Sequence, residues 1–135
     1  MIDSIFENII YSYTRTQALE DGVLVDVSLM AAEACINWPM AVTRRLWEEV
    51  IVPSSEGREQ AGQSEEGRLW DTLWLLRSIF AKQLRPQTAE ENIIIYKVYY
   101  VMGSRNKLRP ISIKCVLAGD DNGSPCLTLM LPEED

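Results

Sequence analysis

The stretch NIIIYKVYYVMGSRNKLRPISIKCVLAGDDNGSPCLTLMLP, residues 92–132, decides the fold class. It holds three runs rich in β-branched and aromatic residues, which favour strands, and the turn-like runs GSRNKLRP and DDNGSP separate them. These links are shorter than the crossover that parallel pairing needs. We therefore expect a three-stranded antiparallel meander over residues 92–102, 109–119 and 125–132.

The strongest helix candidate lies before the meander, in SEEGRLWDTLWLLRSIFAKQL, residues 64–84. Ser64 can cap the first turn, and the acidic residues that follow suit the positive end of the helix dipole. Apolar side chains recur at spacings of three and four, which predicts one broad apolar stripe that includes Trp70 and Trp74. We expect this Trp-rich helix to be the central core helix.

Smaller elements are predicted in the N-terminal part of the chain. Thr14 can cap a helix, and Gly22 suits the left-handed residue after a helix end because it has no Cβ. VLVDVS, residues 23–28, predicts a short strand that could join a sheet edge, with its position left open. Pro39 suits a first helical turn, where its missing N–H costs little. Helices are expected over residues 15–21, 29–35 and 39–50.

Together these elements predict an α+β fold, in which the C-terminal meander packs against the Trp-rich central helix and the smaller N-terminal helices. With 135 residues, of which 47% are apolar, the chain has the size of a single domain over residues 1–135. PSSEGREQAGQSEEG, residues 53–67, has Ala61 as its only apolar residue. Such a run buries too little surface to offset its ordering entropy, so we expect a mobile loop at 53–67.

The charge of the chain is acidic and unevenly distributed. The chain has 13 Lys and Arg against 20 Asp and Glu, a net charge of -7, so direct binding to nucleic-acid phosphates is disfavoured. Residues 1–75 hold 13 acids and 5 bases, whereas residues 76–135 hold 7 acids and 8 bases. This split is compatible with ordinary solvated surface, or with an acidic surface that docks on a basic protein.

The acidic residues of the first part define a candidate partner-binding surface. Their carboxylates could compete with nucleic acid for a basic groove on a host protein. The candidates are Glu48, Glu49, Glu56, Glu59, Glu65 and Glu66.

Two residue types limit the chemistry. The chain has no His, which removes Ser-His-Asp and Cys-His catalysis and the His-containing zinc sites. We predict no metal site and no cofactor. Cys35, Cys115 and Cys126 are isolated and odd in number, which indicates reduced, buried thiols in a cytoplasmic protein. No run approaches the roughly 18 apolar residues of a membrane helix, so we expect no membrane contact.

The segment YSYTR, residues 11–15, is ambiguous. Tyr11, Tyr13 and Arg15 could line a pocket in which the arginine receives a phosphate or carboxylate and the rings stack on a flat base. In the structural alternative the tyrosines pack and Arg15 pairs with a nearby acid or with water. Asp26 either points outward from an edge or is buried beside an arginine, in which case it joins this possible ligand pocket.

Four blocks carry a resemblance: YSYTRTQALEDGVLVDVS, INWPMAVTRRLW, EEGRLWDTLWLLRSI and LTLMLPEED. Together they resemble a family of small acidic proteins of unknown function found on bacterial plasmids, phages and integrated elements. The resemblance implies an accessory role, because some small acidic proteins of similar origin inhibit restriction or CRISPR systems. It provides no catalytic residue.

Three functional hypotheses follow. The first is a non-catalytic accessory protein of a mobile element that binds and inhibits a host defence or DNA-processing protein, in the manner of antirestriction and anti-CRISPR proteins, through its acidic surface. The alternative is a small enzyme or ligand-binding domain that uses Tyr11, Tyr13, Arg15 and Asp26. A third is a homodimer held by an exposed edge of the meander.

Overall fold

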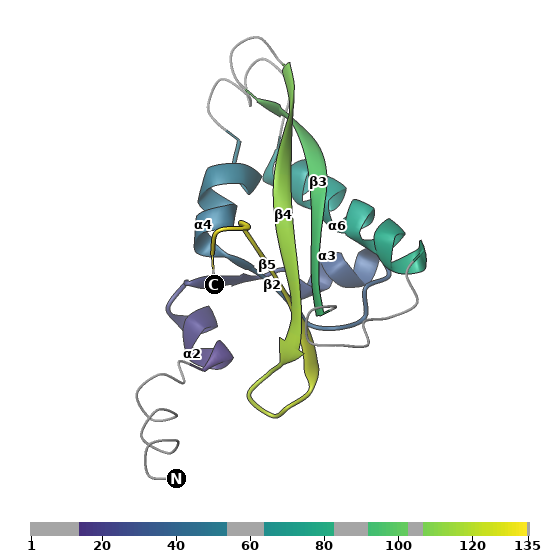
Figure 1. Cartoon of the computed structure of the whole chain (residues 1–135). Helices are drawn as coiled ribbons and strands as arrows, with labels where there is room; N and C mark the ends of the chain where they lie inside the picture. The colour runs from purple at the N-terminus through teal and green to yellow at the C-terminus, as the bar shows by residue number, and fades with distance from the viewer. Residues whose placement is uncertain (1–13, 54–63, 83–91, 103–106, 135) are drawn as a thin grey trace.

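The computed structural model describes residues 14–53, 64–82, 92–102 and 107–134 (Figure 1). The helices are α2 (Arg15–Glu20), α3 (Ser28–Glu33), α4 (Arg44–Leu46), the π-helix η1 (Trp47–Ile51) and α6 (Glu65–Lys82). The strands are β1 (Leu24–Asp26), β2 (Met40–Thr43), β3 (Ile93–Met102), β4 (Lys107–Gly119) and β5 (Pro125–Met130).

The five strands form one sheet in the order β1-β2-β5-β4-β3. As predicted, β3 pairs antiparallel with β4, and β4 pairs antiparallel with β5. The sheet continues beyond the expected meander, because β2 lies parallel to β5 and β1 lies antiparallel to β2. The fold is a mixed α+β arrangement, and β1 reaches the sheet through β2.

The predicted helix over residues 39–50 is wrong in its first part, where β2 is found instead. Met40, Ala41 and Val42 are all buried, since the strand lies inside the sheet. A strand covered on both faces shows no alternation of polar and apolar residues, so a short apolar run does not distinguish it from a buried helix. The helix begins at Arg44, five residues later than predicted, and its N-cap Thr43 accepts at Oγ1 a hydrogen bond of 3.2 Å from the Leu46 N–H.

Local signals predicted α2 correctly. Thr14 is the N-cap, and its hydroxyl accepts a hydrogen bond from the Gln17 N–H in a capping box. Gly22 follows the helix with φ +78°, a left-handed conformation that a Cβ would make costly. Most of the predicted mobile loop, residues 54–63, lies outside the described residues, and its last part forms the first turn of α6.

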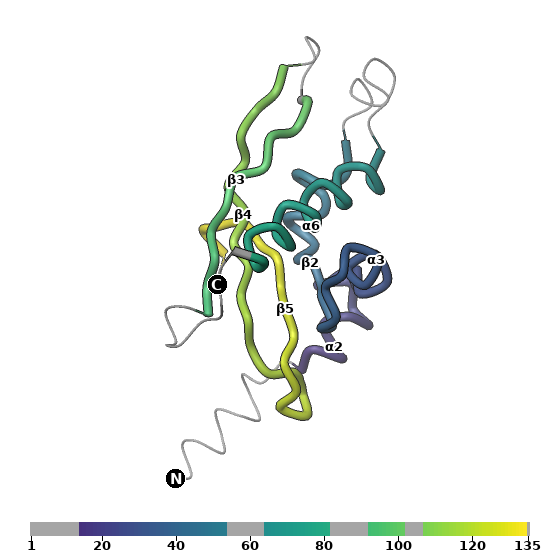
Figure 2. Tube along the Cα trace, turned by 90° about the vertical axis from the view of Figure 1, so that its right-hand side faces the viewer, coloured from purple at the N-terminus to yellow at the C-terminus, as the bar shows by residue number. Residues whose placement is uncertain are grey.

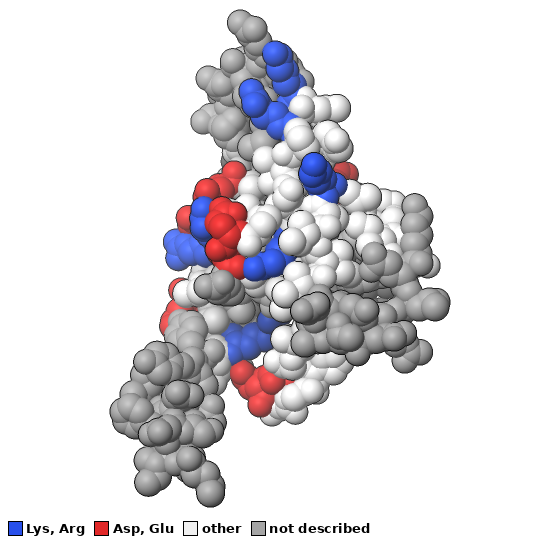
Figure 3. Space-filling model, in the orientation of Figure 1, with Lys and Arg blue, Asp and Glu red and all other residues white. Residues whose placement is uncertain are grey.

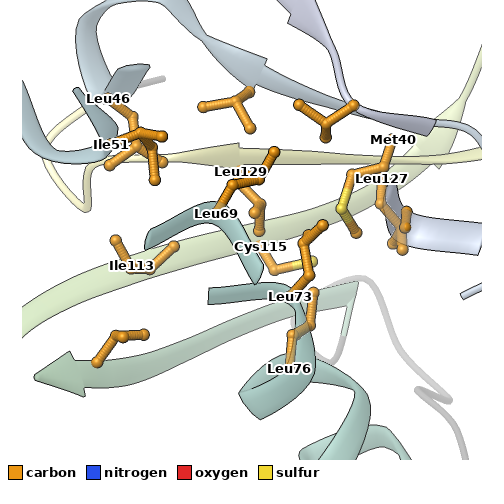
Figure 4. Packing of buried hydrophobic residues seen from close by; sticks show 14 of the residues in the cluster. Met40, Leu46, Ile51, Leu69, Leu73, Leu76, Ile113, Cys115, Leu127 and Leu129 are labelled. Carbon is orange, nitrogen blue, oxygen red and sulfur yellow. The ribbon is translucent and has the colours of Figure 1, made fainter. Parts of the chain in front are cut away.

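One face of the sheet carries the hydrophobic core. Figure 2 shows α6 and α3 together on this side of the strands. Leu73 and Leu76 of α6 are buried against the sheet residues Ile113, Leu127 and Leu129 (Figure 4). Alternate residues of a strand point to opposite faces, so these side chains define the core face and their neighbours define the other.

The opposite face is only partly covered. At the β5 end, Arg15 of α2 donates to Thr128, and the ammonium of Lys114 donates to the backbone carbonyl of Glu134. At the other end, Ile95 and Tyr99 of β3 lie on this face and keep 59% and 60% of their surface exposed.

The cysteine prediction holds for two of three residues. Cys115 and Cys126 are buried free thiols, whereas Cys35 is exposed. Cys35 ends α3 in a left-handed conformation with φ 66°, so its position is set by the helix terminus rather than by the core. In the part of the chain that the structure describes, no helix combines the length and apolar character needed to cross a membrane.

Candidate functional site

Helix α6 buries two polar side chains against the sheet and exposes the two tryptophans that were predicted to be buried. Arg68 and Thr72 lie on the inner flank and are 3% and 0% exposed. Trp70 and Trp74 lie on the outer flank and are 36% and 47% exposed. The prediction that both tryptophans belong to the core is therefore wrong, because leucines of the same stripe fill the space against the sheet.

The inner flank is a closed hydrogen-bonding network. Arg68 donates from Nη1 to the Val50 carbonyl at 2.7 Å and from Nη2 to the Val101 carbonyl at 2.6 Å. Its guanidinium lies 5.7 Å from the centre of the Tyr100 ring. Burial lowers the pKa of Arg68 from its usual value, although an arginine remains charged at neutral pH. Arg68 thus ties η1, α6 and β3 together.

Two tyrosines complete this network. Thr72 Oγ1 donates to the Arg68 carbonyl at 2.7 Å and accepts from Tyr100 Oη at 2.5 Å. Tyr96 Oη donates to the Thr72 carbonyl at 3.1 Å. Burial raises the pKa of Tyr100 to about 12 and raises that of Tyr96 well above its usual value. Both phenols are neutral and engaged in bonds within the protein, so we assign this network a structural role.

The outer flank carries the strongest candidate for a functional surface. The rings of Trp70 and Trp74 stack with their centres 5.7 Å apart and an angle of 17° between planes. The guanidinium of Arg77 lies 5.8 Å from the centre of the Trp74 ring, and Glu66 precedes Trp70 by four residues, on the same side of the helix. We call Glu66, Trp70, Trp74 and Arg77 the tryptophan row.

The tryptophan row has the chemistry of a protein-docking surface. Tryptophan and arginine are enriched among the residues that dominate binding energy at protein interfaces. A large aromatic ring that remains half in water also gains free energy when a partner covers it. Stacking and the contact with Arg77 hold the two rings in place before a partner arrives, which lowers the entropy cost of binding.

The predicted acidic surface is divided by the fold. Glu48 and Glu49 bind Arg44 and Arg45 of the preceding turn, with N–O distances of 2.9 and 2.7 Å. Acidic and basic side chains therefore alternate over α4 and η1 (Figure 3). Glu65 and Glu66 occupy the first turn of α6. Glu56 and Glu59 lie outside the described residues.

An open groove of about 620 Å³ lies beside these ion pairs. Thr43 and Thr128 contribute to its sheet side, and Glu134 lies along it. Arg45 also lines the groove and binds both Glu49 and Glu133, and the hydrogen bond that it donates to Glu49 raises the pKa of its guanidinium. Because these charged groups already have partners in the protein, the groove is a weaker candidate than the tryptophan row.

The predicted ligand pocket is found only in part. Tyr11 and Tyr13 lie outside the described residues. Arg15 donates to Thr128 Oγ1 at 2.7 Å and to the Leu127 carbonyl at 2.8 Å, so its guanidinium holds α2 against β5. Asp26 is exposed, and its carboxylate accepts from the Ser28 N–H at 2.9 Å. The described contacts of Arg15 and Asp26 are therefore structural.

One important residue of this region had no signal in the sequence. Asp121 lies in the turn between β4 and β5, and its carboxylate accepts hydrogen bonds from the Thr16 hydroxyl at 2.6 Å and from the backbone N–H of Arg15 and Thr16. These hydrogen bonds lower the pKa of Asp121, and the bond from the Thr16 hydroxyl makes the largest contribution. The turn residues predict a hairpin but not this cap on a helix 105 residues earlier.

Comparison with known proteins gives a family without a function. The model described as "Family of unknown function (DUF6573)" matches residues 3–135. No curated protein and no solved structure matches the chain. Among the described residues there is no group of three or more His, Cys, Asp or Glu side chains placed to hold a metal ion.

Proposed function

Because this chain belongs to the family of unknown function DUF6573, we propose its role from its surface chemistry. It is a non-catalytic accessory protein of a mobile element, which binds and inhibits a host defence or DNA-processing protein. The mobile-element context rests on the resemblance described above. The binding role rests on the tryptophan row.

The tryptophan row is the observation that carries the proposal. Trp70 and Trp74 together present two stacked indoles on a helix whose other flank fixes its position against the sheet. A partner with an apolar pocket would cover both rings. Because such anchors typically account for most of the binding energy of an interface, we assign affinity to the two indoles.

The acidic residues next to the row supply the preference for a basic partner. Glu66 lies at one end of the row, where a basic rim around the partner's pocket would meet it. Charges at the rim of an interface act mainly on the rate of association and on its salt dependence. Glu48 and Glu49 contribute less to this attraction, because each forms an ion pair with an arginine.

Capture from a host lysate tests the binding role. The double variant Trp70→Ala, Trp74→Ala should lose the partners that the wild-type protein retains, and it should also lose inhibition in a phage or plasmid protection assay. Leu29→Ala on α3 is the matched control, because Leu29 is also an exposed apolar residue. Full capture and inhibition by the double variant, with loss in Leu29→Ala, would assign binding to another surface.

Association rates test the charge preference. With an identified partner, Glu66→Gln should slow association and reduce its salt dependence, while the dissociation rate changes little. Glu33→Gln on α3 serves as the control, because it removes an exposed acid outside the row. Equal rates for the wild-type protein and Glu66→Gln at low salt would show that the attraction comes from elsewhere.

A further inference from the structure

The end strand β3 is unusually suited to pair with another strand. It spans Ile93–Met102, stands last in the strand order and contains Lys97 as its only charged residue. Alternate backbone groups along an edge strand point away from the sheet and remain available for hydrogen bonds. In the described part of the chain, β4 is the only strand that pairs with β3. Long apolar edges of this kind are normally covered or interrupted.

The side chains on the uncovered face of β3 extend the same surface. Ile93, Ile95 and Tyr99 lie on the face opposite α6 and are exposed. Exposed apolar residues that lie together on a monomer mark interaction sites. Uncharged side chains lie along the middle of the neighbouring strand β4, whereas Figure 3 shows Lys and Arg side chains gathered at its upper end. The edge and the face together form one region that is apolar except for Lys97, between Ile95 and Tyr99, and Lys114 of β4, which pairs with Ile95.

We propose that β3 is a homodimer interface, in which it pairs antiparallel with β3 of a second copy across a two-fold axis. The two sheets would then form one continuous ten-stranded sheet, twice the five strands of each copy. Such an interface is isologous, so the same strand must complement itself. The charge on Lys97 determines which alignment meets that requirement.

The residues whose backbone groups point away from the sheet alternate along β3, so these residues face each other only when the two-fold axis passes through a residue and its copy. We call such arrangements even alignments. Two even alignments give the longest overlap, one centred on Lys97 and the other on Val98. Centring on Lys97 places two ammonium groups opposite each other, which is unfavourable. Centring on Val98 places each Lys97 opposite the partner's Tyr99, on the uncovered face of the sheet.

The alignment centred on Val98 is therefore the predicted one. It places an ammonium beside an aromatic ring twice, once on each side of the axis, and such pairs are favourable. It also places Tyr96 opposite the partner's Tyr100 on the core face, and Ile95 opposite the partner's Val101 on the other. The second copy thus matches both the charge and the apolar character of the edge.

Sedimentation equilibrium on the purified full chain tests the interface. We expect a concentration-dependent dimer for the wild-type protein. Tyr99→Lys should raise its dissociation constant at least tenfold, because a lysine would face Lys97 of the other copy. Leu108→Lys on β4 is the control: it adds the same charge to the same face, but away from the edge, and should leave the dimer unchanged.

A charge exchange tests the alignment itself. Combining Lys97→Glu with Tyr99→Lys would place opposite charges across the axis, so the double variant should regain the dimer that Tyr99→Lys loses. A wild-type protein that is monomeric at its highest soluble concentration would overturn the proposal, since Lys97 would then act as a guard against edge pairing. A wild-type dimer that Tyr99→Lys does not weaken, or that the exchange does not restore, would also overturn it.

Discussion

The two flanks of α6 use the same helical turns in opposite ways. The inner flank buries a guanidinium and a hydroxyl, Arg68 and Thr72, while the outer flank leaves Trp70 and Trp74 36% and 47% exposed. Hydropathy alone would predict that the two tryptophans are buried and that Arg68 and Thr72 are exposed. The inner flank combines core leucines with two polar side chains whose hydrogen-bond partners lie on η1 and β3, and both features accompany the burial of this flank rather than the other.

The hydrogen-bond acceptors for Arg68 are backbone carbonyl groups near the ends of neighbouring elements. Val50 lies near the C-terminus of η1, where helical carbonyls lack partners within their own helix. Val101 lies near the end of β3. Arg68 donates to both carbonyls, and an arginine can satisfy several acceptors from one buried position. No tryptophan could do so, because its indole offers a single donor.

The largest effect is expected where the inner flank meets the sheet. Leu73 is fully buried in the core cluster, so Leu73→Ala should lower the free energy of unfolding by about 3 to 5 kcal/mol, through lost burial and the cavity left behind. Urea unfolding measures this change. A midpoint close to that of the wild-type protein would mean that the inner flank is not the core side of the helix.

Removal of the guanidinium should have the next largest effect. Arg68→Met keeps most of the volume but leaves the Val50 and Val101 carbonyls without this donor, and each buried unsatisfied group costs about 1 to 3 kcal/mol. We expect a loss of about 2 to 3 kcal/mol in urea unfolding. A variant as stable as the wild-type protein would show that packing, and not hydrogen bonding, holds the inner flank in place.

The core strands that face the inner flank should also make the protein sensitive to alkali. Burial raises the pKa of Cys115 to about 12 and that of Tyr100 to about 12, whereas the unfolded groups ionise near pH 8.5 and pH 10, roughly. Above those values the unfolded chain loses protons that the folded chain keeps. Stability should therefore fall as pH rises toward 12, by about 1.4 kcal/mol per pH unit for each group.

Tyr100→Phe isolates one of these groups. The variant should be less stable than the wild-type protein at neutral pH by about 1 kcal/mol, because Thr72 loses the bond from the phenol. Above pH 10, roughly, its stability should fall less steeply with pH. Urea midpoints measured at several pH values distinguish these effects. Parallel curves for the two proteins would contradict the raised pKa of Tyr100.

Sequence patterns predicted the elements with local signals and missed those that depend on distant partners. The cap at Thr14, the left-handed Gly22 and the three C-terminal strands follow from neighbouring residues, and the structure contains them. β2 was missed because its burial depends on strands far along the chain. A similar limit applies to Asp121, whose helix partner lies 105 residues earlier.

The candidate site was harder to predict than the fold. The apolar period of α6 identified a helix with a buried stripe but could not assign its flanks, because Arg68 and Thr72 are polar by composition and buried by their partners. The acids Glu48 and Glu49 suggested a free acidic surface. Their arginine partners lie four residues earlier, a spacing that favours ion pairs on a helix and could have indicated the neutralised pairs.

The smallest effect on stability is expected on the outer flank. Trp74→Ala removes a ring that is 47% exposed, stacks on Trp70 and lies near the guanidinium of Arg77, so the free energy of unfolding should fall by about 1 kcal/mol or less. The same substitution should weaken partner capture strongly, because the exposed part of the indole is buried only when a partner binds. Urea unfolding and capture, measured together with Leu73→Ala, compare the two flanks directly. A stability loss as large as that of Leu73→Ala would place Trp74 in the core and remove the basis for the tryptophan row.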